Sequence, residues 1–349
     1  MKIINNFSLI NHNTFGVDAI ANQFTSISSI NELKKIISSN ESKEKIFIGG
    51  GSNILITKKI EGLVIHLNIK GISSKKIDNN YTEVNIKAGE NWNEAVIWCL
   101  KNDLGGIENL SLIPGNTGAA PIQNIGAYGV ELKDVFTSCE VLNVNTNEIV
   151  EFSKVDCQFE YRNSIFKKNK NYIILSVKLK LTHANHKLKV DYGSINEKLI
   201  SLGIGNPKIN DIAKIVTQIR KEKLPDPKKI GNSGSFFKNP IIKKKQLEKL
   251  KLNFKNIPNY KISDENYKIP AGWLIEKAGF KGKRIKDYGV HKNQALVLVN
   301  YGNATGKEIL EFSLSIEKAI QFIFDIKLEN EVNIISVSYT HLTLTTRSY

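Results

Sequence analysis

The chain contains few cysteines: three in 349 residues, none of them in a CxxC pair. An odd number of isolated cysteines argues against a disulfide framework and fits a reducing compartment. No apolar run approaches the roughly 18 residues that a membrane-spanning helix needs. The first ten residues lack the apolar core of a secretory signal, and the six histidines have no metal-ligand spacing. We therefore expect a soluble cytoplasmic protein that binds no metal and no membrane.

Acidic residues are also comparatively few, since 34 Asp and Glu stand against 49 Lys and Arg, for a net charge of +15. A basic surface attracts phosphate backbones, so one hypothesis is a nucleic-acid-binding protein without a cofactor. The other is a composition rich in Lys, Ile and Asn, combined with a small phosphorylated ligand. Because no nucleic-acid-binding motif accompanies the charge, we favour the second hypothesis and expect no nucleic-acid partner.

The length is enough for about two domains at roughly 150 residues each. Short β-branched segments such as residues 45–48 and 172–181 predict strands, and residues 92–101 have helical spacing. After residue 206, helices are predicted over residues 211–222, with Asn210 as N-cap, and from Thr305, whose hydroxyl can form a capping box with Glu308. The residues expected on the inner face of that last helix are Ile309, Leu310, Phe312, Ile316, Ile320 and Ile323. Strands mixed with helices, without regular βαβ alternation, indicate an α+β fold.

Two glycine-rich segments are candidates for binding a cofactor. Residues 49–53, with the sequence GGGSN, follow a predicted strand, and successive amides in such a turn form an anion-binding nest. Residues 113–129 are long and uncharged, and an irregular loop of that length is usually functional. The Rossmann fingerprint is absent, because Ile54 occupies the position of its third glycine. Two backbone cradles without that spacing suggest a flavin dinucleotide bound by another fold.

The second half of the chain supplies reactive side chains. Ser235 lies between a glycine and two phenylalanines, where a buried hydroxyl can donate a proton, although an isolated serine is more often part of a turn. No GxSxG motif is present, which argues against a hydrolase triad. For Arg162 and Glu331, each beside apolar sequence, a structural ion pair is the default interpretation.

Taken together, these segments resemble one family, the UDP-N-acetylenolpyruvoylglucosamine reductases, which are flavoenzymes of peptidoglycan precursor synthesis. The resemblance spans about residues 10–336, and its specificity lies in the combination of segments. The matching segments are residues 13–16, 49–53, 113–129, 161–164, 223–228, 231–240, 271–275, 294–298 and 328–332.

The resemblance implies a vanillyl-alcohol-oxidase-type (PCMH-type) FAD-binding domain of two α+β subdomains, followed by a C-terminal α+β substrate-binding domain. The corresponding bounds are residues 1–67 and 68–205 for the two subdomains, about 15–183 for the PCMH-type domain, and 206–336 for the C-terminal domain. It also implies non-covalent FAD and NADPH as hydride donor. The implied FAD-binding residues are Gly49, Gly50, Gly51, Ser52, Asn53, Pro114, Gly115, Gly118, Ala119, Gln123, Asn124, Gly126, Ala127, Tyr128 and Gly129.

In the family's reaction, a nucleotide-sugar enolpyruvyl ether takes a hydride from flavin N5. By resemblance, Ser235 is the proton donor, Arg162 stabilises the charge that develops on the substrate carboxylate, and Glu331 assists. The implied substrate-binding residues are Tyr192, Lys223, Asn239 and Gln294. Lys223 matches a lysine on the diphosphate, and Tyr192 a tyrosine that folds over the substrate in the subclass having that loop.

Three features depart from the family pattern. Asn330 stands where a proline is common, Asn163 stands where an aspartate is frequent, and residues 337–349 resemble a non-native tail. An alternative within the same superfamily is an FAD-dependent alcohol or hydroxy-acid oxidase. We expect a monomer, because no exposed heptad or apolar stripe is evident.

Overall fold

The computed structural model describes residues 1–39 and 44–336, so the expected non-native tail lies outside the described residues. The first sheet is built from the N-terminal part of the chain, and three of its four strands are parallel. In spatial order they are β1 (Ile4–Ser8), β2 (Ile20–Ile27), β5 (Ile60–Leu67) and β3 (Lys45–Ile48). Helix α1 (Ile30–Ser38) begins where the Ser29 hydroxyl accepts a hydrogen bond from the Glu32 amide.

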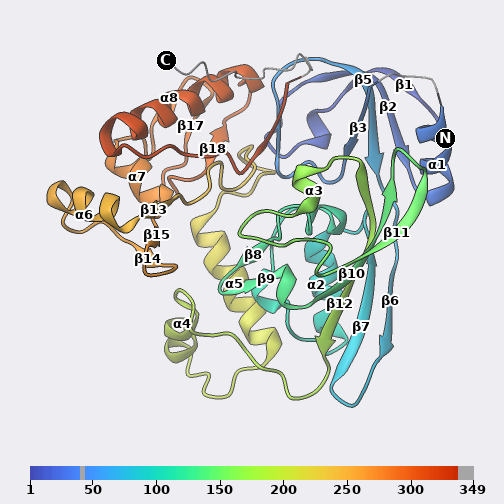
Figure 1. Cartoon of the computed structure of the whole chain (residues 1–349), viewed down its shortest axis with the longest axis horizontal. Coiled ribbons are helices and arrows are strands. Elements are labelled where there is room, and N and C mark those ends of the chain that lie inside the picture. Colours follow the sequence, from blue (N-terminus) through green and yellow to red (C-terminus); the bar gives the residue numbers. More distant parts are fainter. Residues whose placement is uncertain (40–43, 337–349) are drawn as a thin grey trace.

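The second sheet has five antiparallel strands and lies on the right of Figure 1. Its strands, in spatial order, are β11 (Glu148–Ser153), β10 (Phe136–Asn143), β12 (Tyr172–Thr182), β7 (Tyr81–Lys87) and β6 (Ile72–Lys76). Alternate residues of β7 are buried, as expected for a strand with one face on the core. Helix α2 (Trp92–Lys101) confirms the predicted bounds, and its N-cap is Asn91.

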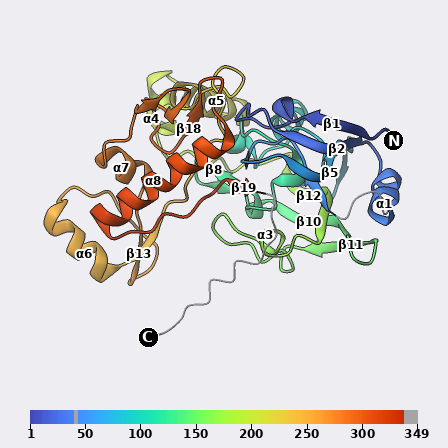
Figure 2. The same cartoon turned by 90° about the horizontal axis from the view of Figure 1, so that it is seen from above.

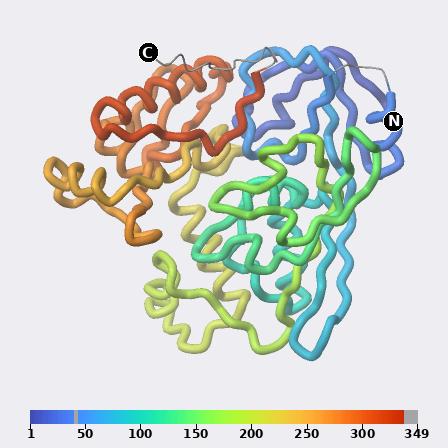
Figure 3. The backbone as a smooth tube through the Cα atoms, in the orientation of Figure 1, coloured from blue at the N-terminus to red at the C-terminus, as the bar shows by residue number. Residues whose placement is uncertain are grey.

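Helix α3 (Ile165–Lys168) lies between β11 and β12 in the chain, and helices α4 (Ile195–Ser201) and α5 (Ile209–Lys223) follow β12. The predicted N-cap of α5 is wrong, because Asn210 lies inside the helix and Lys208 is the N-cap. The Asp211 carboxylate accepts a hydrogen bond from the Lys208 amide and so fixes the earlier start. The helix ends at Lys223, and its C-cap Leu224 is extended, as a residue before proline should be. Figure 3 follows the chain through α4 and α5 into the C-terminal part.

Up to residue 336, the C-terminal part has two small antiparallel sheets and three helices. The sheets consist of β13 (Ile241–Lys243), β15 (Asn266–Lys268) and β14 (Tyr260–Lys261), and of β16 (Arg284–Ile285), β17 (Tyr288–Val290) and β18 (Leu298–Asn300); the helices are α6 (Lys244–Asn253), α7 (Ala271–Lys277) and α8 (Gly306–Phe324). The capping box of Thr305 and Glu308 is confirmed. Ile323 contradicts its expected inward position, since it is 42% exposed.

One strand pair joins the N-terminal part of the chain to its C-terminal part. β4 (Ile54–Ile56), directly after the glycine turn, pairs in parallel with β19 (Asn333–Ile335), and Figure 2 shows β19 beside the N-terminal strands. The Asn333 amide donates to the Asn53 carbonyl oxygen over 3.0 Å. A single apolar cluster contains Phe15 and Leu55 from the N-terminal part together with Phe236 from the C-terminal part. The turn at residues 49–53 is therefore held against the segment that carries Glu331.

Candidate active site

The turn at residues 49–53 has backbone amides that the protein itself does not use. Gly51 is buried with a φ of +62°, and the amides of residues 50–53 donate no hydrogen bond to any acceptor within residues 1–39 and 44–336. Four consecutive uncommitted N–H groups form the nest expected for an anion. The turn thus fits the pyrophosphate of a flavin dinucleotide.

The two glycine-rich segments also pack against each other at backbone distance. A Cβ atom added to Gly50 would lie 2.8 Å from Asn116 Oδ1, and one added to Gly115 would lie 2.4 Å from Ser52 Oγ. The Ser52 hydroxyl donates to the Pro114 carbonyl oxygen over 3.2 Å. These glycines are therefore required for loop packing, which the sequence did not reveal.

Asn53 connects three parts of the site through one side chain. Its Nδ2 donates to Gln123 Oε1 over 2.6 Å and to the Glu331 carbonyl oxygen over 3.2 Å. The resemblance implied FAD-binding roles for Asn53 and Gln123, and the structure shows in addition that their side chains form a hydrogen bond with each other. The glycine turn, the long loop and the C-terminal segment consequently share one hydrogen-bond network.

Arg162 is held in an uncommon backbone conformation, with a φ of +52°. For a residue other than glycine this conformation costs about 1–3 kcal/mol, and such strain is typical of functional sites. Its Nε lies 3.2 Å from Glu331 Oε1, and its Nη atoms donate to the carbonyl oxygens of Asn124 and Gly126. The structure thus brings two of the residues predicted to be catalytic into contact with each other, against the end of the loop that was expected to hold the flavin.

Glu331 is nearly enclosed, with its side chain 15% exposed. Burial raises the pKa of the Glu331 carboxyl, and the Arg162 guanidinium is the strongest opposing influence. Asn330, where the family commonly has proline, has paired backbone on both sides: the Lys238 amide donates to the Glu329 carbonyl oxygen and the Glu331 amide to that of Phe236. The Glu331 side chain therefore reaches Arg162 without the proline.

Ser235 lies in an extended segment that runs between two other segments of the chain, one containing Leu296 and the other containing Glu331. The Phe236 amide donates to the Leu296 carbonyl oxygen, and the Phe236 carbonyl oxygen accepts from the Glu331 amide. Ser235 itself pairs with Val297 and is half-buried. Its hydroxyl forms no hydrogen bond within the described part of the chain, so its proton is not committed to the protein. Regular strand structure begins only at β18, but residues 296–297, directly before it, complete this arrangement.

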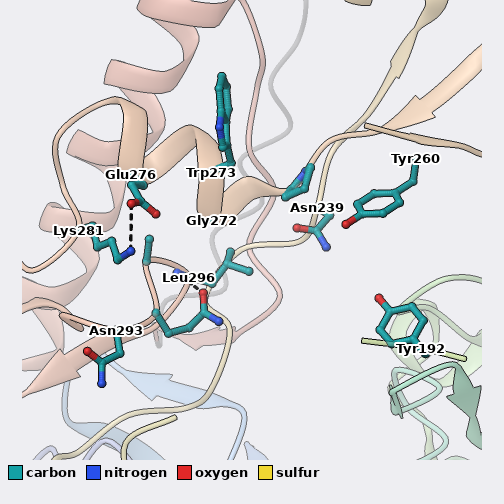
Figure 4. A pocket seen from close by; sticks show the side chains of 12 residues that line it. Tyr192, Asn239, Tyr260, Gly272, Trp273, Glu276, Lys281, Asn293 and Leu296 are labelled. Atoms are coloured by element: carbon teal, nitrogen blue, oxygen red, sulfur yellow. Dashed lines mark hydrogen bonds and ion pairs between the residues drawn. The ribbon is translucent and has the colours of Figure 1, made fainter. Parts of the chain in front are cut away.

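A pocket of about 340 Å³ in the C-terminal part brings together three of the four predicted substrate-binding residues, Tyr192, Asn239 and Gln294. In Figure 4 Tyr192 and Asn239 lie on one side, and the ion pair of Lys281 with Glu276, at 3.0 Å, lies on the other. Sequence reasoning missed several residues that line this pocket. They are Tyr260, Pro270, Trp273, Glu276, Lys281 and Asn293. The matching segment at residues 271–275 was a signal for Trp273, but helical spacing alone does not separate a wall residue from a core residue.

Lys223 is the predicted substrate-binding residue that the structure does not bring to the pocket. It is the last residue of α5, is exposed, and has no hydrogen bond or ion pair through its side chain in the described ranges. Tyr192 is 60% exposed, and a Cβ atom added to Gly129 would lie 3.2 Å from its Cβ. Gly129, whose φ is +80°, therefore lets the Tyr192 loop approach the long loop.

The described residues contain neither a candidate metal-binding cluster nor a helix that could span a membrane. No group of three or more His, Cys, Asp or Glu side chains is placed to hold a metal ion. None of the helices between residues 1 and 336 has the length and apolar character needed to cross a bilayer.

Two family models match this chain, and together they define the class of protein to which it belongs. The family model described as "FAD binding domain" matches residues 22–153, and the model "UDP-N-acetylenolpyruvoylglucosamine reductase, C-terminal domain" matches residues 226–335. These matches, together with the anion nest, make the chain an FAD-dependent oxidoreductase.

Similar full-length proteins then specify the family. UDP-N-acetylenolpyruvoylglucosamine reductase from Flavobacterium johnsoniae is 51% identical over 337 residues, which is 96% of this chain and 100% of that protein. The protein of the same name from Amoebophilus asiaticus is 46% identical over 339 residues, with coverage of 96% and 100%. The crystal structure of the reductase from Thermus caldophilus shares the fold, with a TM-score of 0.66 at 22% identity over 96% of this chain and 98% of that one. The chain belongs to the UDP-N-acetylenolpyruvoylglucosamine reductase family.

Family membership confirms the resemblance, the fold class, FAD as cofactor and a place in peptidoglycan precursor synthesis. NADPH as hydride donor fits the reaction of this family. Membership therefore favours the reductase over both the alcohol-oxidase and the nucleic-acid-binding alternatives.

Proposed function

We propose that the protein catalyses the NADPH-dependent, FAD-mediated reduction of UDP-N-acetylglucosamine enolpyruvate to UDP-N-acetylmuramate. The observation that carries this proposal is the Arg162–Glu331 pair, at 3.2 Å, held beside the segment of the uncommitted Ser235 hydroxyl. The turn at residues 49–53 and the loop at residues 113–129 would hold FAD, which would supply the hydride transfer from NADPH to the terminal enol carbon.

The side chains of the site stabilise the charge that develops on the substrate and supply the proton that completes the reduction. Hydride addition leaves negative charge at the ether-bearing carbon, delocalised into the substrate carboxylate. Arg162 stabilises this charge because a guanidinium can bind a carboxylate through charge-assisted hydrogen bonds. Ser235 delivers its proton to the ether-bearing carbon; a hydroxyl is a weak acid, so the step requires a strongly basic carbanion in a site sheltered from water. Glu331 orients the Arg162 guanidinium.

The nucleotide-sugar occupies the pocket that Tyr192, Asn239 and Gln294 line. Lys223 is assigned to its diphosphate by resemblance alone. The remaining FAD-binding assignments in residues 49–53 and 114–129 are proposed on the same basis, supported by the nest of amides.

We further propose a monomer in the cytoplasm, with FAD-binding subdomains at residues 1–67 and 68–205 and a substrate-binding domain at residues 206–336. All three cysteines are buried and free, in keeping with a reducing compartment.

An anaerobic absorption experiment tests the function. The purified protein is expected to show the visible flavin band, to lose it on addition of NADPH, and to regain it when UDP-N-acetylglucosamine enolpyruvate follows. UDP-N-acetylglucosamine, which lacks the enolpyruvyl group, is the control and should not restore the band. A flavin that NADPH does not bleach, but that a simple alcohol reduces, would contradict the proposal and favour an oxidase.

A further inference from the structure

A buried asparagine outside the pocket links two loops of the proposed site. Asn109 lies in a short 3-10 helix and is 1% exposed. Its Nδ2 donates to the Tyr128 carbonyl oxygen over 2.9 Å and to the Lys189 carbonyl oxygen over 2.8 Å. Tyr128 belongs to the long loop that is proposed to bind FAD, and Lys189 stands three residues before Tyr192 in the chain. One side-chain amide therefore connects the long loop to the segment that carries Tyr192.

In the described part of the chain, the segment that carries Tyr192 has one hydrogen-bonded attachment. It runs without helix or strand from β12 to α4, and its side chains Leu188 and Val190 pack on an apolar cluster of α4 and α5. Within the described ranges, no hydrogen bond other than the one from Asn109 involves residues 187–193. The bond to the Lys189 carbonyl oxygen is therefore what fixes the position of the backbone directly before Tyr192.

The other atom of the Asn109 amide shows which part of the side chain is used. Its Oδ1 is buried and accepts no hydrogen bond from any residue of the described ranges. A buried polar atom without a partner is unfavourable, and an apolar side chain of similar size would avoid that cost. The two hydrogen bonds that Nδ2 donates to the loops are therefore the contribution that an asparagine makes at this position.

The same two loops also touch directly after Tyr128. A Cβ atom added to Gly129 would lie 3.2 Å from Tyr192 Cβ, and Tyr192 lines the pocket together with Asn239 (Figure 4). Because Asn109 bonds to the residue before Gly129 and to the segment before Tyr192, it sets the spacing at which this contact forms. A displacement of that segment would move the Tyr192 ring relative to the pocket.

We infer that Asn109 is a positioning residue, which places Tyr192 at the nucleotide-sugar pocket by fixing the segment before it to the long loop. The inference rests on the proposed function. Asn109 acts through Tyr192 and makes no contact with substrate of its own, because it is enclosed by protein. The competing interpretation is structural: Asn109 would only stabilise the fold by pairing two carbonyl oxygens.

The test is a double-mutant cycle in single-turnover reoxidation of the reduced flavin by UDP-N-acetylglucosamine enolpyruvate. Asn109→Ala removes both donors, and we expect the half-saturating substrate concentration to rise about tenfold, the effect of losing one or two hydrogen bonds. The rate at saturating substrate should change by less than about twofold. Tyr192→Ala removes the ring that Asn109 positions, so in that background Asn109→Ala should raise the half-saturating concentration by less than about twofold. The ratio of flavin to protein absorbance shows whether each variant retains FAD.

Asn147 provides the matched control. Its Nδ2 also donates to two acceptors, Ser38 Oγ at 2.9 Å and the Lys34 carbonyl oxygen at 3.4 Å, and its Oδ1 is also unpaired within the described ranges. These bonds connect the turn between β10 and β11 to α1. Glycine is the suitable replacement, because the φ of Asn147 is +56°. Asn147→Gly should lower stability and leave the half-saturating concentration at the wild-type value.

The outcomes separate the two interpretations. If Asn109→Ala raises the half-saturating concentration equally with and without the Tyr192 ring, Asn109 does not act through Tyr192 and the inference is overturned. If Asn109→Ala does not retain FAD, Asn109→Asp provides the test. Its carboxyl donates to a carbonyl oxygen only when protonated, so its half-saturating concentration relative to wild type should fall between about pH 8 and about pH 6. A ratio that does not change with pH would overturn the inference.

Failure of the inference is distinguishable from failure of the proposed function. Wild-type protein whose reduced flavin is not reoxidised by this substrate would overturn the proposed function. Wild-type reoxidation together with an unchanged half-saturating concentration in Asn109→Ala overturns this inference alone.

Discussion

The Nε atom of Arg162 lies 3.2 Å from Oε1 of Glu331, and this contact joins the FAD-binding half of the chain to its C-terminal part. The Nη atoms of the same guanidinium donate to the carbonyl oxygens of Asn124 and Gly126. One side chain thus fixes both the end of the long loop and the acidic residue opposite it. For Arg162 or Glu331 taken alone, a structural ion pair is the default interpretation. The proposed chemistry needs the same contact, because it holds the Arg162 guanidinium in place.

Replacing Arg162 by Met should expose this dependence. The variant leaves the enclosed Glu331 carboxylate without its closest partner, so we expect the free energy of unfolding to fall by about 3 kcal/mol, as for other broken buried pairs. The double variant Arg162→Met/Glu331→Gln should regain part of this loss, because no carboxylate is then left unpaired. Urea unfolding of the two single variants and the double variant measures the coupling. Strictly additive effects would show that the two residues do not stabilise each other.

Ser235 and Ser233 provide a matched pair of substitutions. The Ser235 hydroxyl has no partner among the described residues, so Ser235→Ala should leave stability unchanged but slow reoxidation of the reduced flavin by substrate at least 100-fold, the typical effect of losing a proton donor. Reduction by NADPH should not change. Ser233 is buried and donates to the Ile54 carbonyl oxygen over 3.2 Å; Ser233→Ala should cost about 1 kcal/mol of stability and affect neither half-reaction selectively. Stopped-flow spectra separate the two half-reactions, and an equal slowing of both by Ser235→Ala would remove Ser235 from the proton-transfer step.

The parts of the fold that follow local rules were predictable from the sequence. The bounds of α2 follow from helical spacing, and the start of α8 follows from the capping box of Thr305 and Glu308. The N-cap of α5 was missed because Asp211 can reach the Lys208 amide, a choice between two polar residues that spacing does not resolve. The pairing of β4 with β19 is a parallel contact between opposite ends of the chain, and no local signal specifies it.

The candidate site, like the fold, has features that could be predicted from the sequence and features that only the structure reveals. The predicted catalytic residues came from the resemblance, since a lone serine, arginine or glutamate has no chemistry in the sequence that distinguishes it from structure. The bond between Asn53 and Gln123 and the two loop contacts of Asn109 depend on side-chain placement across separate segments. Such contacts leave no periodicity or spacing in the sequence, so they required the structure.

Gly51 and Gly16 share a φ of +62° but differ in their surroundings. A Cβ atom added to Gly51 would lie 2.0 Å from the His12 carbonyl oxygen, whereas one added to Gly16 would have no atom within 4 Å. Gly16→Ala should therefore cost only the backbone strain, about 1 kcal/mol. Gly51→Ala must in addition displace the turn, so we expect a larger loss of stability together with loss of FAD. Thermal unfolding and the ratio of flavin to protein absorbance measure both effects. Equal FAD content in the two variants would show that the turn can move without losing the cofactor.

His66 gives the protein a defined sensitivity to acid. Burial, together with the smaller effect of the neighbouring His12 and Lys70 charges, lowers the pKa of His66 to about 4. Its Nδ1 lies 3.0 Å from the Ser26 hydroxyl oxygen. Because the folded pKa is below the ordinary value of 6.5, the unfolded chain binds this proton first. The stability from neutral His66 is therefore complete above about pH 6.5 and is lost as the pH falls toward about 4.

A His66→Gln variant should show a flatter dependence of stability on pH over that range. Since the ring is only half-buried, solvent screening reduces the expected difference to about 1 kcal/mol. Urea unfolding of both proteins at about pH 7 and about pH 4.5 measures it. His12, whose pKa burial also lowers, lies 5.1 Å from His66 between ring centres, so the variant also removes the repulsion that arises when both rings are protonated. Parallel curves for the two proteins would mean that other groups carry the acid sensitivity and that protonation of His66 does not oppose folding.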